Sequence, residues 1–400
     1  MAASSPYQQN TTAQNVLLIS GIILIAINMR PALAGVGPLI GAIRDTTGLS
    51  NTMLGLLTTL PLLAFGVLST LTPLFTRRLG IEGTLAAALA LLTGGLFLRV
   101  IPTNAALFGG TLLAGIAIAF GNVLLPSIVK RDFPNHTGIM TSVYSSVLGL
   151  GATIAAGVSV PLAFDFNWGW HWALGAWGIV SAIAFFVWLP QLKDLTLPKN
   201  DKSFRKALQD LGRSGKAWKV ALFMGLQSLA FYVILAWLPE ILQDRGLTAN
   251  TAGWMLSLSQ GMGVLGSIAL PFWAEKKKDQ RSLVWLLLIL EIISLAGLLF
   301  PEPDMYWVGL WVSLIGFSLG GSFGLALLFI VLRTSDTQTA TELSGMAQSI
   351  GYLLAAVGPT FFGALHDLSG AWFIPILFLF LVTIAKLFMG LGAARPQKIS

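Results

Sequence analysis

Residues Val16–Pro38 read VLLISGIILIAINMRPALAGVGP and include a single charged side chain, that of Arg30. An α-helix rises 1.5 Å per residue, so about 20 apolar residues cross the roughly 30 Å hydrocarbon core of a bilayer. This stretch is therefore long enough to span a membrane. A guanidinium keeps its proton, and a central arginine opposes membrane insertion by roughly 2.5–3.5 kcal/mol. Arg30 therefore needs compensation, which an anionic or strongly dipolar ligand in a water-filled cavity would supply.

Comparable apolar stretches follow one another along the whole chain. Its 400 residues are 55% hydrophobic and only 10% charged, with a mean hydropathy of +0.78. This composition leaves too little polar surface to cover a soluble globule of that size. The sequence predicts an all-α integral membrane protein with twelve transmembrane helices. We expect them to begin near residues 16, 53, 82, 105, 138, 171, 218, 251, 282, 306, 343 and 372.

Two absences narrow the chemistry further. The chain has no cysteine, which excludes disulfides, thiol catalysis and cysteine-ligated metal. The first fifteen residues lack the basic region and cleavage site of a secretory signal, so we expect the first span to be retained. We expect no metal and no cofactor.

Basic residues gather in the connections that share one side of the membrane. By the positive-inside rule this side is cytoplasmic, so both termini are predicted to be cytoplasmic. This placement also explains the net charge of +7 without a nucleic-acid partner. Outside the central connection, the basic residues on this side are Arg77, Arg78, Lys130, Arg131, Lys276, Lys277, Lys278, Arg281, Arg333, Arg395 and Lys398.

The second half of the chain repeats the first after a shift of about 200 residues. Leu49, Gly55 and Pro73 correspond to Leu247, Gly253 and Pro271, and Phe120-Gly121 corresponds to Phe323-Gly324. Two six-helix halves of the same orientation imply a pseudo-two-fold axis along the membrane normal, with the substrate site at mid-depth between them. Such an arrangement is typical of alternating access.

The repeat divides the chain into three parts. We expect an N-terminal six-helix bundle at 1–190, a cytoplasmic linker at 191–217 and a C-terminal six-helix bundle at 218–400. Phe204, Leu208 and Leu211 have the spacing of an amphipathic helix lying on the membrane surface. A disordered linker is the alternative.

Three segments resemble a known family. They are TTLPLLAF at 58–65, GNVLLPSIVKRDFP at 121–134 and LSGMAQSIGYLLAAVGP at 343–359. Together they are similar to the cyanate and nitroimidazole porter branch of the major facilitator superfamily. The resemblance implies the major facilitator fold, the bacterial inner membrane, and secondary active transport of a small polar or anionic planar solute. The expected partners are this solute and the bilayer, and we expect a monomer.

The cytoplasmic connections carry candidate gating residues. In the superfamily, the connection between helices two and three usually places an acidic residue ahead of a basic pair. Here it contains Arg77 and Arg78 without the acid. Asp132, next to Lys130 and Arg131, could have a similar role.

Arg30 is the candidate central substrate-binding cation. At an effective dielectric near 20, an anion 4 Å from it gains on the order of 4 kcal/mol, comparable with the insertion penalty. The repeat places Phe231 and Tyr232 opposite Arg30, with Gln227 one turn earlier. A flat solute could stack on the aromatic rings on one side and form hydrogen bonds with Arg30 on the other. The alternative is a structural Arg30, bonded to backbone carbonyls or helix ends.

Further polar residues inside the spans complete the candidate binding set. Each alone is also explained by a hydrogen bond between neighbouring helices. On a continuous first helix, Asn28 lies about 200° from Arg30, and Arg30 shares a face with Leu33, Ala34 and Gly37. The set adds Asn28, Asn122, Tyr144, Gln260, Gln348 and Tyr352.

Glu291 and Lys386 are the remaining charges at depth. Both lie about 15 Å from the cytoplasmic side, on helices nine and twelve. We predict a structural ion pair at the back of the C-terminal half, with proton coupling as the alternative.

Other function classes fit less well. Gly261-x-Gly-x-x-Gly266 matches a dinucleotide fingerprint but lies within an apolar helix with no preceding strand, so a membrane enzyme is not favoured. A proton-coupled exporter of hydrophobic or cationic drugs usually has a carboxylate in its cavity, whereas the inferred cavity is cationic. A nitrate-type carrier would be expected to have more positive charge than one arginine.

Overall fold

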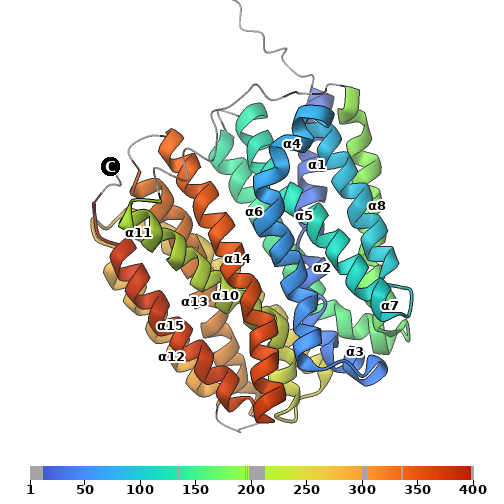
Figure 1. The fold of residues 1–400 in the computed structure, drawn as a ribbon, viewed down its shortest axis with the longest axis vertical. Helices are drawn as coiled ribbons and strands as arrows, with labels where there is room; N and C mark the ends of the chain where they lie inside the picture. The colour runs from blue at the N-terminus through green and yellow to red at the C-terminus, as the bar shows by residue number, and fades with distance from the viewer. Residues whose placement is uncertain are drawn as a thin grey trace, which may run out of the picture.

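The computed structural model describes residues 12–133, 136–193, 195, 197, 212–299, 304–334 and 337–397. These residues form helices and connecting turns, with no strand among them. Figure 1 shows the first half of the chain beside the second half, with their long helices in roughly the same direction. The all-α prediction is confirmed.

The first half contains α1 (Thr12–Asn28), α2 (Pro31–Ala34), the short 3₁₀ helix η1 (Gly37–Leu39), α3 (Ile40–Thr47), α4 (Asn51–Leu98), α5 (Asn104–Asp132), α6 (Thr137–Val160), the π turn η3 (Pro161–Asp165), α7 (Gly169–Gly175), α8 (Trp177–Trp188) and the 3₁₀ turn η4 (Leu189–Lys193). The second half contains α10 (Gly215–Gln243), α11 (Ala249–Glu275), α12 (Arg281–Gly297), α13 (Met305–Leu332), α14 (Thr337–Ser369) and α15 (Phe373–Ala393).

Eleven helical stretches in the described part of the chain are long and apolar enough to cross a membrane. The remaining predicted span, the ninth, is α12, which is shorter at 17 residues. Helix α4 contains two spans, Asn51–Leu68 and Leu74–Leu98. Its backbone turns at Gly80, whose φ of 71° lies in the left-handed region that favours glycine.

Contacts between the two halves follow the sequence repeat. They are concentrated where α4 packs on α14 and where α6 packs on α11. These pairs join span 2 to span 11 and span 5 to span 8, so a shift of six spans exchanges one pair for the other. The packing therefore has the two-fold relationship that the repeat predicts.

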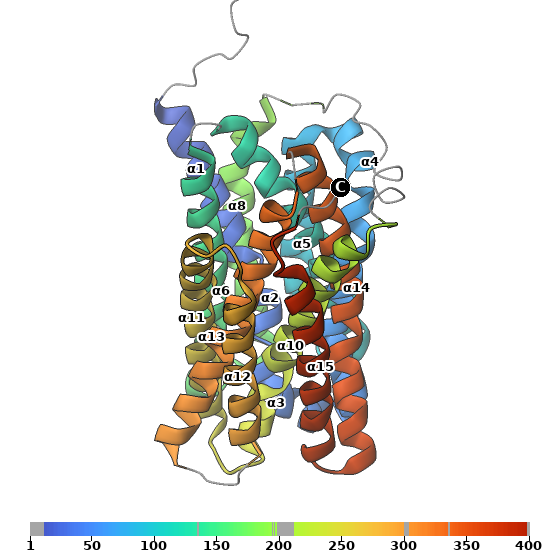
Figure 2. The same cartoon turned by 90° about the vertical axis from the view of Figure 1, so that its left-hand side faces the viewer.

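The two ends of the helical stack differ. Figures 1 and 2 show the start of α1 and the end of α15 toward one end, which we call the terminal face. Helix α3 lies at the other end, which we call the opposite face. Large apolar side chains are exposed on the outer helices, as contact with lipid requires. Examples are Ile179, Phe186, Leu381 and Phe388.

The connection between the halves is described only at its ends. η4 ends at Lys193 and α10 begins at Gly215. The predicted amphipathic helix at Phe204, Leu208 and Leu211 lies outside the described residues.

Candidate functional site

The first membrane span is broken at Arg30. Helix α1 ends at Asn28 and α2 begins at Pro31, with Arg30 at the N-cap position of α2. Proline has no N–H to donate to the preceding turn, and its ring clashes with the carbonyl four residues earlier. The expectation of one continuous helix is therefore wrong, and so is the shared helix face inferred for Arg30 and Gly37. The span also continues beyond Pro38, through α3 to Thr47.

Glycines on neighbouring helices allow the broken segment to pack closely. A Cβ on Gly121 of α5 would lie 3.1 Å from the side chain of Met29. A Cβ on Gly151 of α6 would lie 2.5 Å from the carbonyl oxygen of Ile27. The backbone around Arg30 is thus held by close contacts from both helices.

A cavity lies between the two halves, with Arg30 in its lining. It contains about 1250 Å³ of space between protein atoms, including the part open to solvent. Its lining residues on α5 and α13 lie in the second halves of these helices, whereas most of those on α6 and both of those on α14 lie in the first halves. All four of these helix ends are at the terminal face. The cavity therefore extends from mid-depth toward the terminal face.

Arg30 connects the two halves inside this cavity. Its Nη1 donates a hydrogen bond of 2.7 Å to the phenol oxygen of Tyr232 on α10. The guanidinium carbon lies 6.0 Å from the ring centre of Phe231 and 5.9 Å from that of Tyr232. At these distances the rings stabilise the positive charge through cation–π attraction. Among the described lining residues, Arg30 is the only one that carries a formal charge.

The cavity brings together all the predicted binding residues except Asn28. The described lining includes Arg30, Asn122, Tyr144, Gln227, Phe231, Tyr232, Gln260, Gln348 and Tyr352. Asn28 is 2% exposed, and its Nδ2 donates to the carbonyl oxygens of Leu24 and Val180, at 2.7 and 3.4 Å. Its side chain therefore joins α1 to the α8 side of the bundle.

Several lining residues were missed by sequence reasoning. Ser145 and Ser228 directly follow predicted residues, and Phe323 lies in the repeated string of α13. Serine is common in apolar helices, so its presence alone is a weak signal. The repeat could have identified Phe323, because its counterpart Phe120 lies on a span that contributes to the cavity.

Charged and polar contacts close the opposite face between the halves. Arg44 of α3 forms an ion pair with Glu240 of α10, and its Nη1 also donates to Asn51 at 3.1 Å. Asp367 of α14 accepts from the backbone N–H groups of Asn51 and Thr52, at 3.1 and 2.8 Å. Asp367 thereby caps the N-terminus of α4 from the other half. These contacts between the halves are not evident from the sequence.

Close backbone contacts between the halves continue from the opposite face toward mid-depth. A Cβ on Gly37 would lie 2.5 Å from the carbonyl oxygen of Leu235. A Cβ on Gly55 would lie 2.6 Å from the carbonyl oxygen of Pro359. Thr59 donates to the carbonyl oxygen of Ala356 at 2.7 Å. The halves therefore touch below the cavity, on the side away from the chain termini.

The predicted gating residues lie at the terminal face. Arg77, Arg78 and Lys130 are exposed. Arg131 bonds Asp132 through Nε and Nη2, both at 2.7 Å, and Glu82 through Nη1 at 2.5 Å. Both acids belong to the same half as Arg131. These contacts join α5 to α4 and do not bridge the two halves.

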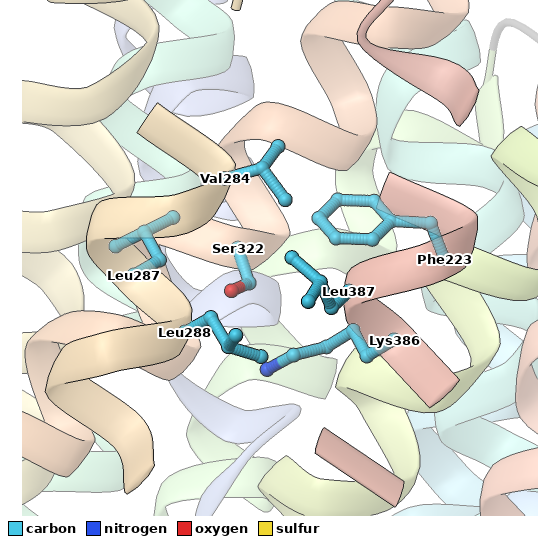
Figure 3. Close-up of a pocket in the computed structure, with 7 residues that line it drawn as sticks. All are labelled: Phe223, Val284, Leu287, Leu288, Ser322, Lys386 and Leu387. Carbon is cyan, nitrogen blue, oxygen red and sulfur yellow. The ribbon is translucent and has the colours of Figure 1, made fainter. Parts of the chain in front are cut away.

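Glu291 and Lys386 form a buried ion pair between α12 and α15. Their exposed fractions are 1% and 2%. The Glu291 carboxylate also accepts from Thr383 at 2.7 Å and from Ser318 at 3.2 Å. Figure 3 shows the Lys386 side chain beside Leu288 and Leu387, in closely packed and mostly apolar surroundings. The pairing agrees with the prediction, and neither residue lines the Arg30 cavity.

The chain is similar to known proteins over most of its length. Residues 17–359 match the sequence profile of the Major Facilitator Superfamily. The chain is 43% identical to the uncharacterized transporter YycB of Bacillus subtilis (strain 168), over 98% of this chain and 97% of that protein. It is 38% identical to the 2-nitroimidazole transporter of Escherichia coli (strain K12), over 96% and 97%. It is 28% identical to the cyanate transport protein CynX of the same organism, over 87% and 90%.

Solved structures agree in fold. The D-xylose–proton symporter matches with a TM-score of 0.77 at 15% identity, covering 97% of this chain and all of that chain. A mutant of the nucleoside transporter NupG matches with a TM-score of 0.76 at 15% identity, covering 94% and 99%.

Proposed function

We propose that this chain, which belongs to the major facilitator superfamily and is a multi-pass secondary transporter, carries a small, flat, polar or anionic organic solute. Arg30 is the central binding cation in this proposal. The solute binds between the broken first span and α10, and crosses by alternating access of the two halves. The 2-nitroimidazole and cyanate transporters among its relatives support a compact planar solute.

The observation that carries the proposal is the placement of Arg30. Its guanidinium lies in a cavity whose described lining contains no acidic side chain. In such a site the positive charge attracts an anion or the negative end of a dipole. The rings of Phe231 and Tyr232 add flat apolar surfaces, and Gln227, Gln260 and Gln348 add amide groups. This lining supports a flat polar solute better than a cationic drug.

The packing also supports a direction for the cavity. Contacts between the halves close the opposite face, while the cavity extends toward the terminal face. With both termini in the cytoplasm, as the positive-inside rule favours, the structure corresponds to an inward-facing state. Transport then requires the contacts at the opposite face to separate.

Uptake into proteoliposomes tests the proposal. Purified protein should accumulate labelled 2-nitroimidazole or cyanate, and recovered solute should be chemically unchanged. Arg30→Lys should reduce uptake by at least about tenfold, because an ammonium does not reproduce the planar fork of a guanidinium. Arg281→Lys is the matched control, since Arg281 pairs with Asp279 at the surface, outside the cavity. Equal uptake by Arg30→Lys and Arg281→Lys would overturn the role of Arg30.

A further inference from the structure

One edge of the Arg30 guanidinium has no partner in the described part of the chain. Nη1 is bonded to Tyr232, whereas Nε and Nη2 form no hydrogen bond with any residue that the structure describes. Arg30 lines the cavity and its side chain is only partly buried, so a solute in the cavity can approach the guanidinium. A guanidinium presents Nε–H and Nη2–H as a parallel pair that matches the two oxygens of a carboxylate. The unpaired edge of Arg30 therefore has the geometry that a carboxylate would match.

The same protein uses this edge for carboxylates elsewhere. Arg131 directs Nη1 to Glu82, and its Nε and Nη2 bind the two oxygens of Asp132. Arg281 likewise directs Nε and Nη2 to Asp279, at 2.8 and 2.5 Å to one oxygen. Arg30 has the arrangement of Arg131, with a phenol in place of Glu82 and no described residue in place of Asp132.

The space beside this edge is suited to a ring. Phe231 and Tyr232 lie next to the guanidinium, and Tyr144, Phe323 and Tyr352 also line the cavity. The space between its protein atoms, about 1250 Å³ including the part open to solvent, leaves room for a solute larger than a triatomic anion. Aromatic walls favour flat rings in offset or edge-to-face contact. A substrate that fills the site therefore combines one planar anionic group with a small aromatic ring.

We propose that the solute class of this transporter is small aromatic monocarboxylates, bound through the carboxylate to Nε and Nη2 of Arg30 and through the ring to the aromatic lining. This inference rests on the proposed function and narrows it. A nitro group has the planar shape of a carboxylate but little charge. Nitroimidazoles therefore occupy the same edge with lower affinity.

Binding to the purified full-length protein tests the solute class. Calorimetry or thermal shift would compare benzoate, benzamide, cyclohexanecarboxylate, 2-nitroimidazole and cyanate. Benzoate should bind at least about tenfold more tightly than benzamide, because a charged acceptor forms the stronger paired bonds. Benzoate should also bind more tightly than cyclohexanecarboxylate, because only the ring of benzoate is flat. Arg30→Lys should lower the affinity for benzoate by about tenfold or more and should change the affinity for benzamide much less.

The outcomes show which of the two proposals fails. Equal binding of benzoate and benzamide would overturn the carboxylate assignment. Arg30-dependent binding of 2-nitroimidazole or cyanate without binding of benzoate would also overturn it, but would leave the proposed function standing. If folded wild-type protein binds none of the five compounds, both proposals fail. Phe231→Leu tests the role of the aromatic lining, because it should lower the affinity for benzoate more than the affinity for cyclohexanecarboxylate.

Discussion

Arg44 of α3 and Glu240 of α10 form an ion pair that joins the two halves of the molecule at the face opposite the chain termini. The Glu240 side chain is 4% exposed, and that of Arg44 is 34% exposed. The pair lies at equivalent ends of the first and seventh spans, which are related by the repeat. Its separation is therefore part of any movement that opens this face.

Removing Arg44 should favour the state in which the opposite face is open. Arg44→Gln leaves the buried Glu240 carboxylate without its cation, which costs about 1–3 kcal/mol, or roughly tenfold in the ratio of states. Glu240→Gln should have less effect, because Arg44 can turn to water. The readout is the rate at which a thiol reagent labels a single cysteine at Ala236, which is 2% exposed in a chain without native cysteine. Equal labelling rates in Arg44→Gln and the parent protein would contradict a role for the Arg44–Glu240 ion pair in holding the opposite face closed.

Gly37→Ala should reduce transport without unfolding the protein. The new Cβ would lie 2.5 Å from the carbonyl oxygen of Leu235, so the halves cannot close as they do here. We expect transport to fall by about tenfold, which corresponds to about 1.4 kcal/mol. Gly253→Ala is the matched control, because its Cβ would meet Ala156 at 3.2 Å and needs only a small adjustment. If both variants transport alike, close contact at Gly37 is not required.

Replacing one residue of the Glu291–Lys386 pair should destabilise the fold more than replacing both. Replacing one partner of a buried pair leaves an uncompensated charge and costs about 3–5 kcal/mol. Lys386→Met or Glu291→Leu alone should therefore lower the melting temperature more than the double substitution. Equal losses in all three proteins would reject pairing as the source of stability. Full transport by the double variant would show that neither charge is needed for proton coupling.

Arg99→Met should leave stability unchanged or raise it. Arg99 is fully buried, and its Nη1 donates to the carbonyl oxygen of Ala32 at 2.9 Å. Its Nε and Nη2 are buried without a partner in the described part of the chain. Burial of a charge costs several kcal/mol, whereas a hydrogen bond from a charged group contributes about 1.5–3 kcal/mol. A clear fall in melting temperature would contradict this balance.

The same substitution should weaken solute binding. Ala32 lies in the short α2 helix directly after Arg30, so loss of its donor loosens the segment that positions the guanidinium. We expect the dissociation constant for benzoate or 2-nitroimidazole to rise about threefold, the effect of roughly 0.7 kcal/mol. An unchanged constant would mean that the broken segment holds its shape without Arg99.

Much of the fold could be predicted because it depends on composition and repetition. Apolar length gave the spans, and the repeat placed Phe231 and Tyr232 opposite Arg30, where the structure has them. Apart from Asn28, the predicted polar residues line one cavity because most inward-facing polar groups of such a bundle face the same space. Their role in binding a solute stays a prediction.

The break at Arg30 and the closed face could not be predicted in the same way. Proline is tolerated in many membrane helices, so Pro31 alone does not reveal whether a helix bends or ends. The close approach of Gly121 and Gly151 to the broken segment depends on the packing of three helices, which the sequence alone does not reveal. The pairing of Arg44 with Glu240 depends on which face of the molecule is closed. Because one sequence is common to all conformational states, it does not indicate which face is closed in this structure.

The single formal charge in the described cavity lining has an electrical consequence. An empty site carries Arg30 uncompensated, whereas a bound monoanion makes the site neutral. A transmembrane potential acts at about 2.3 kcal/mol per elementary charge per 100 mV across the full field. Voltage should therefore act on the return of the unloaded carrier and leave the loaded step nearly unaffected.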